Sequence, residues 1–434
     1  MPDPEPGPVS SSGDAPFDEP LDDDIAELGR RAKAASRILA LASTATKDDA
    51  LRTAADLLVD RSTELLRANA VDVARATDQG VSATVIDRLR LTEAKIEAMA
   101  TGLRQVAALA DPVGEVLDGW TRPNGLRIRR ERVPLGVVAI IYENRPNVTS
   151  DAAGLCLKSG NAAFLRGSSG AITSNIAVAN IMRDGVTKAG LPADAVILVT
   201  DTSREAAVEF MQQRGSIDCL IPRGGPSLIR SILEHATVPY VIDGDGNCHV
   251  YVDESADLDM ALDIVVNAKT QRPSVCNAAE SLLVHRAVAG LFLPRVGEAM
   301  PGVELLGDAD TRALISRAGV ADEEAYATEF LDLTMSVRVV DSLDQAIDHV
   351  NRFGTGHSEA IVTRSLEAAE RFTAEVDAAA VVVNASTRFV DGEEFGFGAE
   401  IGISTQKLHA RGPMGLRELT TAKYVVNGTG QIRS

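Results

Sequence analysis

The sequence predicts an α/β fold with two doubly wound parallel-sheet domains. Short runs made almost wholly of apolar residues, such as residues 135–142, have the length of a strand that is buried on both faces. Segments of helical length separate these runs, and this alternation is typical of a parallel sheet with helices on both faces. The chain has 434 residues, which exceeds the size at which a single core usually stops growing, so more than one domain is expected.

The charge and the cysteines exclude several classes of protein. A formal net charge of -19 argues against nucleic-acid binding, which needs a basic face. No run of about 18 apolar residues occurs, so no membrane span is predicted. The four cysteines are far apart with no Cys-x-x-Cys pair, and no His-x-x-x-His or carboxylate cluster suggests a metal. We therefore predict a cytoplasmic protein without a metal site.

The N-terminal part is predicted to be a tail followed by helices. Residues 1–24 carry eight acidic groups, no Lys or Arg, and six of the 18 prolines. Such a segment has too little apolar surface to offset its ordering entropy, so residues 1–22 are predicted to be a disordered acidic tail and not a signal peptide. Apolar residues at three- and four-residue spacing then predict helices through residues 23–112.

Two segments have the alternation of β-ribbons. Residues 126–132 alternate apolar and charged side chains after an Asn-Gly turn at Asn124, which predicts a hairpin within residues 114–133. Residues 420–433 alternate again, with an Asn-Gly turn at Asn427, and predict a second ribbon. Each ribbon is either a surface hairpin without a partner or a segment that pairs with another subunit.

Between these ribbons lie two α/β series. Strands are predicted at residues 134–142, 162–166, 195–199 and 217–221, then at 248–252, 281–285, 359–363 and 379–383. Ligands of such sheets bind beyond the carboxyl ends of strands. The loops at 166–170 and 222–226 combine Gly with Arg or Ser where a helix begins, so they are either phosphate-binding loops or tight turns without a ligand. Neither matches the dinucleotide fingerprint or a Walker A loop.

Cys276 has an unusual setting for a packing cysteine. Pro273 bends the chain before it, and Ser274 and Asn277 lie beside it in place of large apolar residues. With the charge of Arg272 nearby, Cys276 is a candidate nucleophile; the alternative is a small buried hydrophobe. A Cys-His dyad is not supported, because the nearest histidine along the chain lies in the following strand.

Several motifs, taken together, resemble the aldehyde dehydrogenase superfamily. They are residues 134–138, 142–149 and 157–161 and the Cys276 loop. Within that superfamily, residues 271–277 and 395–405 are similar to the γ-glutamyl phosphate reductase family, and the likeness runs from about residue 25 to the C-terminus.

The resemblance implies three structural parts. They are an NADPH-binding domain (23–113 and 134–255, with a return at 384–411), a catalytic domain (256–383), and oligomerisation ribbons (114–133 and 412–434). The implied partners are other copies of the chain in a homo-oligomer and, by possible contact, glutamate 5-kinase.

The implied reaction is the NADPH-dependent reduction of L-glutamyl 5-phosphate to L-glutamate 5-semialdehyde with release of phosphate, in proline biosynthesis. Cys276 would form a thioester, and Asn144 would donate to the oxyanion, with Asn147 as the alternative. Hydrolytic members of the superfamily carry a glutamate that activates water. Residues 243–247 occupy the matching region and lack it, which favours a reductase.

The resemblance also implies the binding residues. The cofactor would contact Arg166, Gly167, Ser168, Gly224, Gly225 and Glu329, with Arg166 near the 2′-phosphate. Arg145, Arg272 and Arg411 are candidates for the substrate phosphate and carboxylate, and each could equally be a structural arginine. The alternatives are an acylating dehydrogenase that uses coenzyme A and a non-catalytic scaffold protein.

Overall fold

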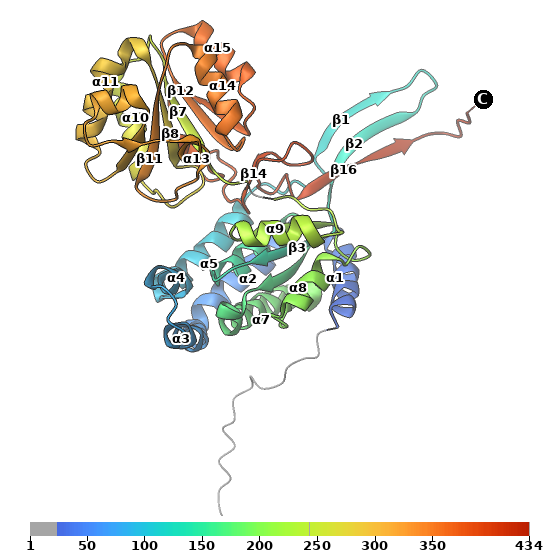
Figure 1. Cartoon of the computed structure of the whole chain (residues 1–434). Coiled ribbons are helices and arrows are strands. Elements are labelled where there is room, and N and C mark those ends of the chain that lie inside the picture. The colour runs from blue at the N-terminus through green and yellow to red at the C-terminus, as the bar shows by residue number, and fades with distance from the viewer. Residues whose placement is uncertain (1–23, 243, 434) are drawn as a thin grey trace, which may run out of the picture.

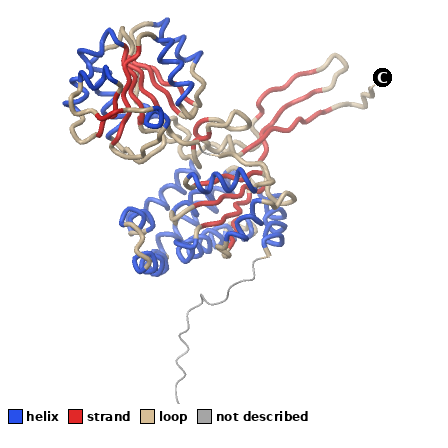
Figure 2. The backbone as a smooth tube through the Cα atoms, viewed as in Figure 1, coloured by secondary structure: helices blue, strands red, loops and turns tan. Residues whose placement is uncertain are grey.

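A computed structural model describes residues 24–242 and 244–433, and the predicted acidic tail at 1–22 lies outside these residues. The chain forms two lobes, and an antiparallel ribbon projects from their junction (Figure 1). Each lobe has a sheet enclosed by helices (Figure 2). No helix of the described residues is both long and apolar enough to cross a membrane.

The N-terminal helices begin at polar caps. The side chains of Asp24, Ser43 and Thr92 accept hydrogen bonds from backbone N–H groups in the first turns of α1, α2 and α5, which satisfies donors that a helix start leaves free. These helices are α1 (Ile25–Leu39), α2 (Thr44–Asp60), α3 (Ser62–Asp78), α4 (Ala83–Leu89) and α5 (Glu93–Ala108). The prediction of helices through residues 23–112 is confirmed.

The first lobe contains a four-stranded parallel sheet in the order β5-β4-β3-β6. Its strands are β3 (Val137–Tyr142), β4 (Ala162–Gly167), β5 (Val196–Val199) and β6 (Cys219–Arg223). The connecting elements are α6 (Asn147–Lys158), η1 (Ser169–Ala171), α7 (Ile172–Lys188), η2 (Ala193–Ala195) and α8 (Arg204–Met211), and α9 (Pro226–His235) follows. Every residue of β3 and β4 is buried, as the apolar runs predict.

The second lobe contains a seven-stranded sheet in the order β10-β9-β11-β8-β7-β12-β13, and its strands pair in parallel. The strands are β7 (Cys248–Val252), β8 (Ala279–His285), β9 (Glu304–Gly307), β10 (Gly319–Val320), β11 (Thr334–Val340), β12 (Ser358–Val362) and β13 (Ala380–Val383). The helices are α10 (Leu258–Thr270), α11 (Arg286–Ala299), α12 (Ala309–Leu314), α13 (Glu323–Ala327), α14 (Leu343–Phe353) and α15 (Leu366–Glu375).

The boundary between the lobes differs from the predicted one. A boundary at residue 255 assigns β7 to the first lobe, but β7 pairs with β8 and β12 in the second sheet. The chain therefore enters the second lobe just before residue 248. An all-apolar strand does not specify which of two parallel sheets it joins, because both sheets bury such strands on both faces.

The ribbon is one sheet of three antiparallel strands. The predicted hairpin consists of β1 (Val116–Thr121) and β2 (Arg127–Pro134). The C-terminal strand β16 (Thr420–Asn427) pairs with β2, so the predicted second ribbon is a third strand of this sheet and not a hairpin of its own. The alternation in residues 420–427 has the right period, but a pairing across almost 300 residues of sequence cannot be inferred from local pattern.

The segment after β13 returns to the first lobe. It contains η3 (Thr387–Phe389), β14 (Ile403–Ser404) and β15 (Gly412–Pro413). Ile401, Met414 and Leu419 belong to the same hydrophobic core as β3 and β4. The first lobe is therefore completed by the last part of the chain.

Candidate active site

The loops of the first sheet gather at one edge. Strand register aligns Tyr142 with Gly167 on one side and with Arg223 on the other. The residues after these three positions therefore leave the sheet together at its carboxyl edge, where parallel sheets bind ligands. This register brings together the predicted residues Asn144, Ser168 and Gly224.

Asn144 is held by Ser168. The Ser168 hydroxyl donates to Asn144 Oδ1 at 2.8 Å and accepts from the Asn144 N–H at 3.1 Å. Asn144 also has a φ of 35°, in the left-handed region that residues other than glycine seldom adopt. Its Nδ2 makes no hydrogen bond with the described residues, whereas Nδ2 of Asn147 donates to Asp151 at 2.9 Å. Of the two predicted oxyanion donors, Asn144 thus has the amide available.

The turn after β6 leaves open space. A side chain at Gly225 would meet no atom within 4 Å, whereas one at Gly224 would meet the Glu143 carboxylate at 2.8 Å. The Gly225 N–H donates to Glu143 Oε2 at 3.3 Å. The turn thus has space for a ligand group, and a pyrophosphate bound there would replace Glu143 as the partner of the Gly225 N–H.

Arg166 lies at the end of β4 and is 8% exposed. Its Nη2 donates to the carbonyl oxygens of Thr202 and Ser203 at 2.9 and 2.6 Å. Its Nε is buried without a partner among the described residues. Burial lowers the pKa of Arg166, and the charge of Asp201 opposes that shift.

The Cys276 loop lies at the amino end of β8 and is held by two neighbouring segments, residues 246–248 and 387–390. The Cys248 thiol donates to the carbonyl oxygen of Cys276 at 3.1 Å. Asn277 Nδ2 donates to the Val390 carbonyl at 2.9 Å, and the Thr387 hydroxyl donates to the Asn277 carbonyl at 2.7 Å. Gly246, on the same segment as Cys248, packs so closely that a Cβ there would lie 1.7 Å from the Cys276 carbonyl oxygen. The Cys276 side chain remains partly exposed, unlike the three buried cysteines.

Arginines from both lobes interact around this loop. Arg145 is exposed, yet desolvation by the surrounding chain lowers its pKa, and the positive charges of Arg223, Arg88 and Arg272 lower it further. Burial also lowers the pKa of Arg388, and Arg272 again adds to the shift, while the Cys276 thiol opposes it. Arg145 and Arg272, predicted separately from motifs in different lobes, are therefore within electrostatic reach of one another.

Glu329 belongs to the same region. Its Oε1 accepts a hydrogen bond of 2.7 Å from the N–H of Gly246, the residue that packs against Cys276. Burial raises the pKa of Glu329, and this hydrogen bond partly offsets the shift. The structure thus brings Glu329 to the Cys276 loop, although its sequence context differs from that of the superfamily.

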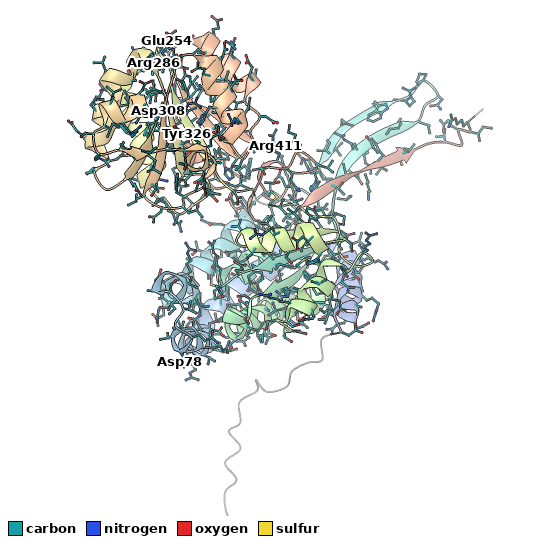
Figure 3. All side chains as sticks on the ribbon, viewed as in Figure 1. Asp78, Glu254, Arg286, Asp308, Tyr326 and Arg411 are labelled. Carbon is teal, nitrogen blue, oxygen red and sulfur yellow. The ribbon has the colours of Figure 1, made fainter. Side chains whose placement is uncertain are left out.

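Arg411 has a different environment. It pairs with Asp377 at 2.7 Å and lines a cavity of about 460 Å³ together with Lys407, Thr405 and Glu359. Figure 3 shows Arg411 between the second lobe and the base of the ribbon. Cys276 does not line this cavity, nor a larger one of about 790 Å³ on the second lobe near Arg286 and Asp308. Contact of Arg411 with substrate stays a prediction.

Sequence reasoning missed Arg388 and the ion pair of Lys269 with Glu280. Arg388 lies shortly after the end of β13, and its Nε donates to Gln271 of the Cys276 loop at 2.8 Å. A lone arginine in a Gly-rich segment gives no signal of this contact. Within residues 24–242 and 244–433 no group of His, Cys, Asp and Glu is arranged to hold a metal ion.

The chain resembles proteins of known sequence and structure over most of its length. The family described as "Aldehyde dehydrogenase family" matches residues 17–329 and 321–425. The gamma-glutamyl phosphate reductases of Clostridium novyi and Moorella thermoacetica are 55% and 57% identical, over 94% of this chain and 99% of theirs.

Solved structures agree with these relatives. The crystal structure of gamma-glutamyl phosphate reductase from Thermotoga maritima has a TM-score of 0.93 and 47% identity, over 95% of this chain and all of that one. An acetylating aldehyde dehydrogenase from Geobacillus thermoglucosidasius shares the fold, with a TM-score of 0.68 at 19% identity, over 94% of this chain and 97% of that one. The chain is therefore an oxidoreductase that belongs to the gamma-glutamyl phosphate reductase family, within the aldehyde dehydrogenase family.

Proposed function

We propose that the enzyme reduces L-glutamyl 5-phosphate to L-glutamate 5-semialdehyde with NADPH, releases phosphate and works through a thioester on Cys276, in proline biosynthesis. One observation carries this proposal. A partly exposed cysteine lies on a loop held by two neighbouring segments; Arg388 donates to that loop, and Arg145 of the other lobe is within electrostatic reach of its Arg272. A nucleophile that must attack an acyl phosphate needs this combination of access, fixed position and positive charge.

In the first step the Cys276 thiolate attacks the acyl carbon. A carbon–sulfur bond forms, the bond from that carbon to the phosphate oxygen breaks, and phosphate leaves with the electron pair. Positive charge from Arg272 and Arg388 stabilises both the thiolate before attack and the phosphate as it leaves.

Each attack on the carbonyl carbon creates an oxyanion that needs hydrogen-bond donors. The Nδ2 amide of Asn144 is one donor, since Ser168 fixes the opposite end of that side chain. The backbone N–H of Cys276 is the second proposed donor.

The residues fit a nicotinamide cofactor in two respects. The open turn at Gly225 would accommodate a pyrophosphate, and Arg166 has a buried Nε without a partner in the described chain. Arg166, Gly167 and Ser168 would hold the adenosine side, Gly224 and Gly225 the pyrophosphate, and Glu329 the nicotinamide ribose. When bound, the cofactor supplies the hydride that reduces the thioester carbonyl to the aldehyde level.

The thioester must be kept from water. The chain lacks a glutamate in residues 243–247, where hydrolytic relatives carry their water-activating base. The nearby Glu329 carboxylate accepts from the Gly246 N–H through Oε1, and its proposed role is to hold the nicotinamide ribose and not to activate water. The segment beside Cys276 therefore favours return of the acyl group to phosphate over hydrolysis.

The acyl phosphate carries a phosphate and an α-carboxylate, so cationic partners are needed at both ends. Arg145 and Arg272 are the proposed partners near Cys276. Arg411 is the proposed partner of the carboxylate, and its ion pair with Asp377 would have to rearrange for that contact.

The reaction is tested in the reverse direction. Purified enzyme with glutamate semialdehyde and NADP⁺ should form NADPH only when inorganic phosphate is present, and Cys276→Ser should abolish this. NADPH formation with coenzyme A and none with phosphate would instead identify an acylating dehydrogenase. Comparing NADP⁺ with NAD⁺ in the wild type and in Arg166→Ala tests the proposed 2′-phosphate contact.

The proposed assembly is a cytoplasmic homo-oligomer formed through the ribbon. Its exposed aromatic side chains, Trp120 and Tyr424, support a partner on that surface. Contact with glutamate 5-kinase stays a prediction. It would shorten the lifetime of the free acyl phosphate.

A further inference from the structure

A buried ion pair lies behind the Cys276 loop. Lys269, in the last turn of α10, pairs with Glu280 of β8 at 2.6 Å, and both side chains are 0% exposed. Glu280 is four residues beyond Cys276 in the chain. Removing two charges completely from water is costly, so such a pair needs further hydrogen bonds to be stable.

The second oxygen of Glu280 reaches a third segment. Glu280 Oε1 accepts a hydrogen bond of 3.2 Å from the N–H of Leu331. Leu331 has a φ of 54°, a left-handed conformation that is unfavourable for a leucine and persists where surrounding contacts enforce it. The ion pair thereby fixes the backbone just after Glu329.

Glu329 in turn contacts the segment under Cys276. Its carboxylate accepts from the Gly246 N–H at 2.7 Å, and Gly246 packs against the Cys276 carbonyl. A continuous series of contacts therefore runs from Lys269 through Glu280 and Leu331 to Glu329, and from there to the loop of Cys276.

The charges of this series depend on each other. Burial raises the pKa of Glu280, whereas Lys269 lowers it, and Glu329 raises it further. Burial likewise raises the pKa of Glu329, and Lys269 lowers it. One buried ammonium thus stabilises both carboxylates of the contact series, Glu280 beside it and Glu329 next to the Cys276 loop.

We infer that Lys269 and Glu280 are positioning residues: they set the place of Glu329 relative to Cys276, and so control both the binding of the nicotinamide cofactor and the reactivity of the thiol. The inference about cofactor binding rests on the proposed function of Glu329, whereas the inference about the reactivity of the Cys276 thiol does not.

The test uses a variant that removes both charges. Lys269→Met alone leaves a buried carboxylate without its cation and can fail to fold, whereas Lys269→Met/Glu280→Leu replaces the pair with apolar groups, a change that proteins often tolerate. The matched control is Lys47→Met/Asp111→Leu, which removes another buried pair (2.6 Å) in the first lobe.

The readouts are the rate of Cys276 alkylation by iodoacetamide and the Kd of NADPH from its fluorescence. Neither measurement requires the enzyme to turn over its substrate. We expect the double variant to stay folded, to change the alkylation rate at least threefold, and to raise the Kd about tenfold, with neither change in the control. The single variant Glu280→Asp should show similar changes in alkylation rate and Kd, because its shorter side chain cannot reach both Lys269 and Leu331.

An unchanged alkylation rate and Kd in a folded double variant would overturn the inference. If both change, but the wild type shows no phosphate-dependent NADPH formation, the positioning role stands and the proposed reaction fails.

Discussion

The Ser168 hydroxyl donates to the side-chain oxygen of Asn144 at 2.8 Å, which orients the amide of Asn144 so that its nitrogen is the end left for a ligand. Asn144→Asp replaces this donor with an oxygen that repels an oxyanion. We expect kcat to fall by about 10²–10³-fold, as for loss of one oxyanion donor. Steady-state kinetics of the wild type and of Asn144→Asp measure this fall in kcat.

Asn147→Ala serves as its control. The Asn147 amide is occupied by Asp151, so kcat should change by less than about threefold. A larger loss at Asn147 than at Asn144 would assign the donor to Asn147.

Gly246 has no room for a methyl group. In Gly246→Ala the new Cβ would lie 1.7 Å from the Cys276 carbonyl oxygen, so the loop must move. Overpacking of this kind costs about 1–3 kcal/mol, and both the melting temperature and the alkylation rate of Cys276 should fall. Gly290→Ala, at a position with no neighbour within 4 Å, should leave both unchanged or raise the melting temperature.

Arg272 is exposed, so we expect it to contribute charge and not packing. Arg272→Gln should raise the KM for phosphate in the reverse reaction about 10–100-fold, the range for a lost charge-assisted hydrogen bond of about 1.5–3 kcal/mol. Arg312→Gln, in the cavity of the second lobe that excludes Cys276, should leave this KM at the wild-type value. If the two substitutions changed the KM for phosphate equally, Arg272 would not be a phosphate-binding residue.

The ribbon presents two aromatic rings to solvent. Trp120 and Tyr424 are 43% and 61% exposed and meet edge to face with ring centroids 6.3 Å apart. Exposed aromatic pairs are typical centres of protein interfaces, so Trp120→Glu/Tyr424→Glu should lower the mass measured by analytical ultracentrifugation. Leu41→Glu, an exposed apolar site elsewhere, should not. A wild-type monomer would contradict the proposed oligomer.

Glu280 should make stability depend on pH. Burial raises its pKa to about 7, above the ordinary value of 4.5. The folded protein therefore holds this proton where the unfolded chain has lost it, so the contribution of Glu280 to stability falls as pH rises from about 4.5 to 7, and then levels. The melting temperature of the wild type relative to Glu280→Gln should decline across that range. A difference in melting temperature between the two proteins that stays constant with pH would contradict the raised pKa of Glu280.

Local pattern predicted the elements that local physics determines. The apolar runs of β3 and β4 specify strands buried on both faces, and the three- and four-residue apolar spacing in residues 23–112 specifies helices. The gathering of Asn144, Ser168 and Gly224 at one sheet edge follows from strand order alone, since the carboxyl ends of parallel strands lie together.

What the sequence could not supply were contacts between distant segments. β16 joins β2, and β7 joins the second sheet, through pairings that no short window contains. Lys269 and Glu280 are only 11 residues apart, yet each looks like an ordinary surface residue until a helix and a strand bury both. The setting of Cys276 made it a candidate nucleophile, and the resemblance supplied Asn144, whereas Arg388 became visible only through its contact with Gln271.

The return of the C-terminal segment to the first lobe has a consequence for synthesis on the ribosome. Met414 and Leu419 belong to the core that the earliest-made helices begin, so that core stays incomplete until nearly the whole chain has been translated. The second lobe, which is continuous from β7 to β13, emerges whole before then. The first lobe, whose synthesis starts earliest, is therefore the last to complete its hydrophobic core.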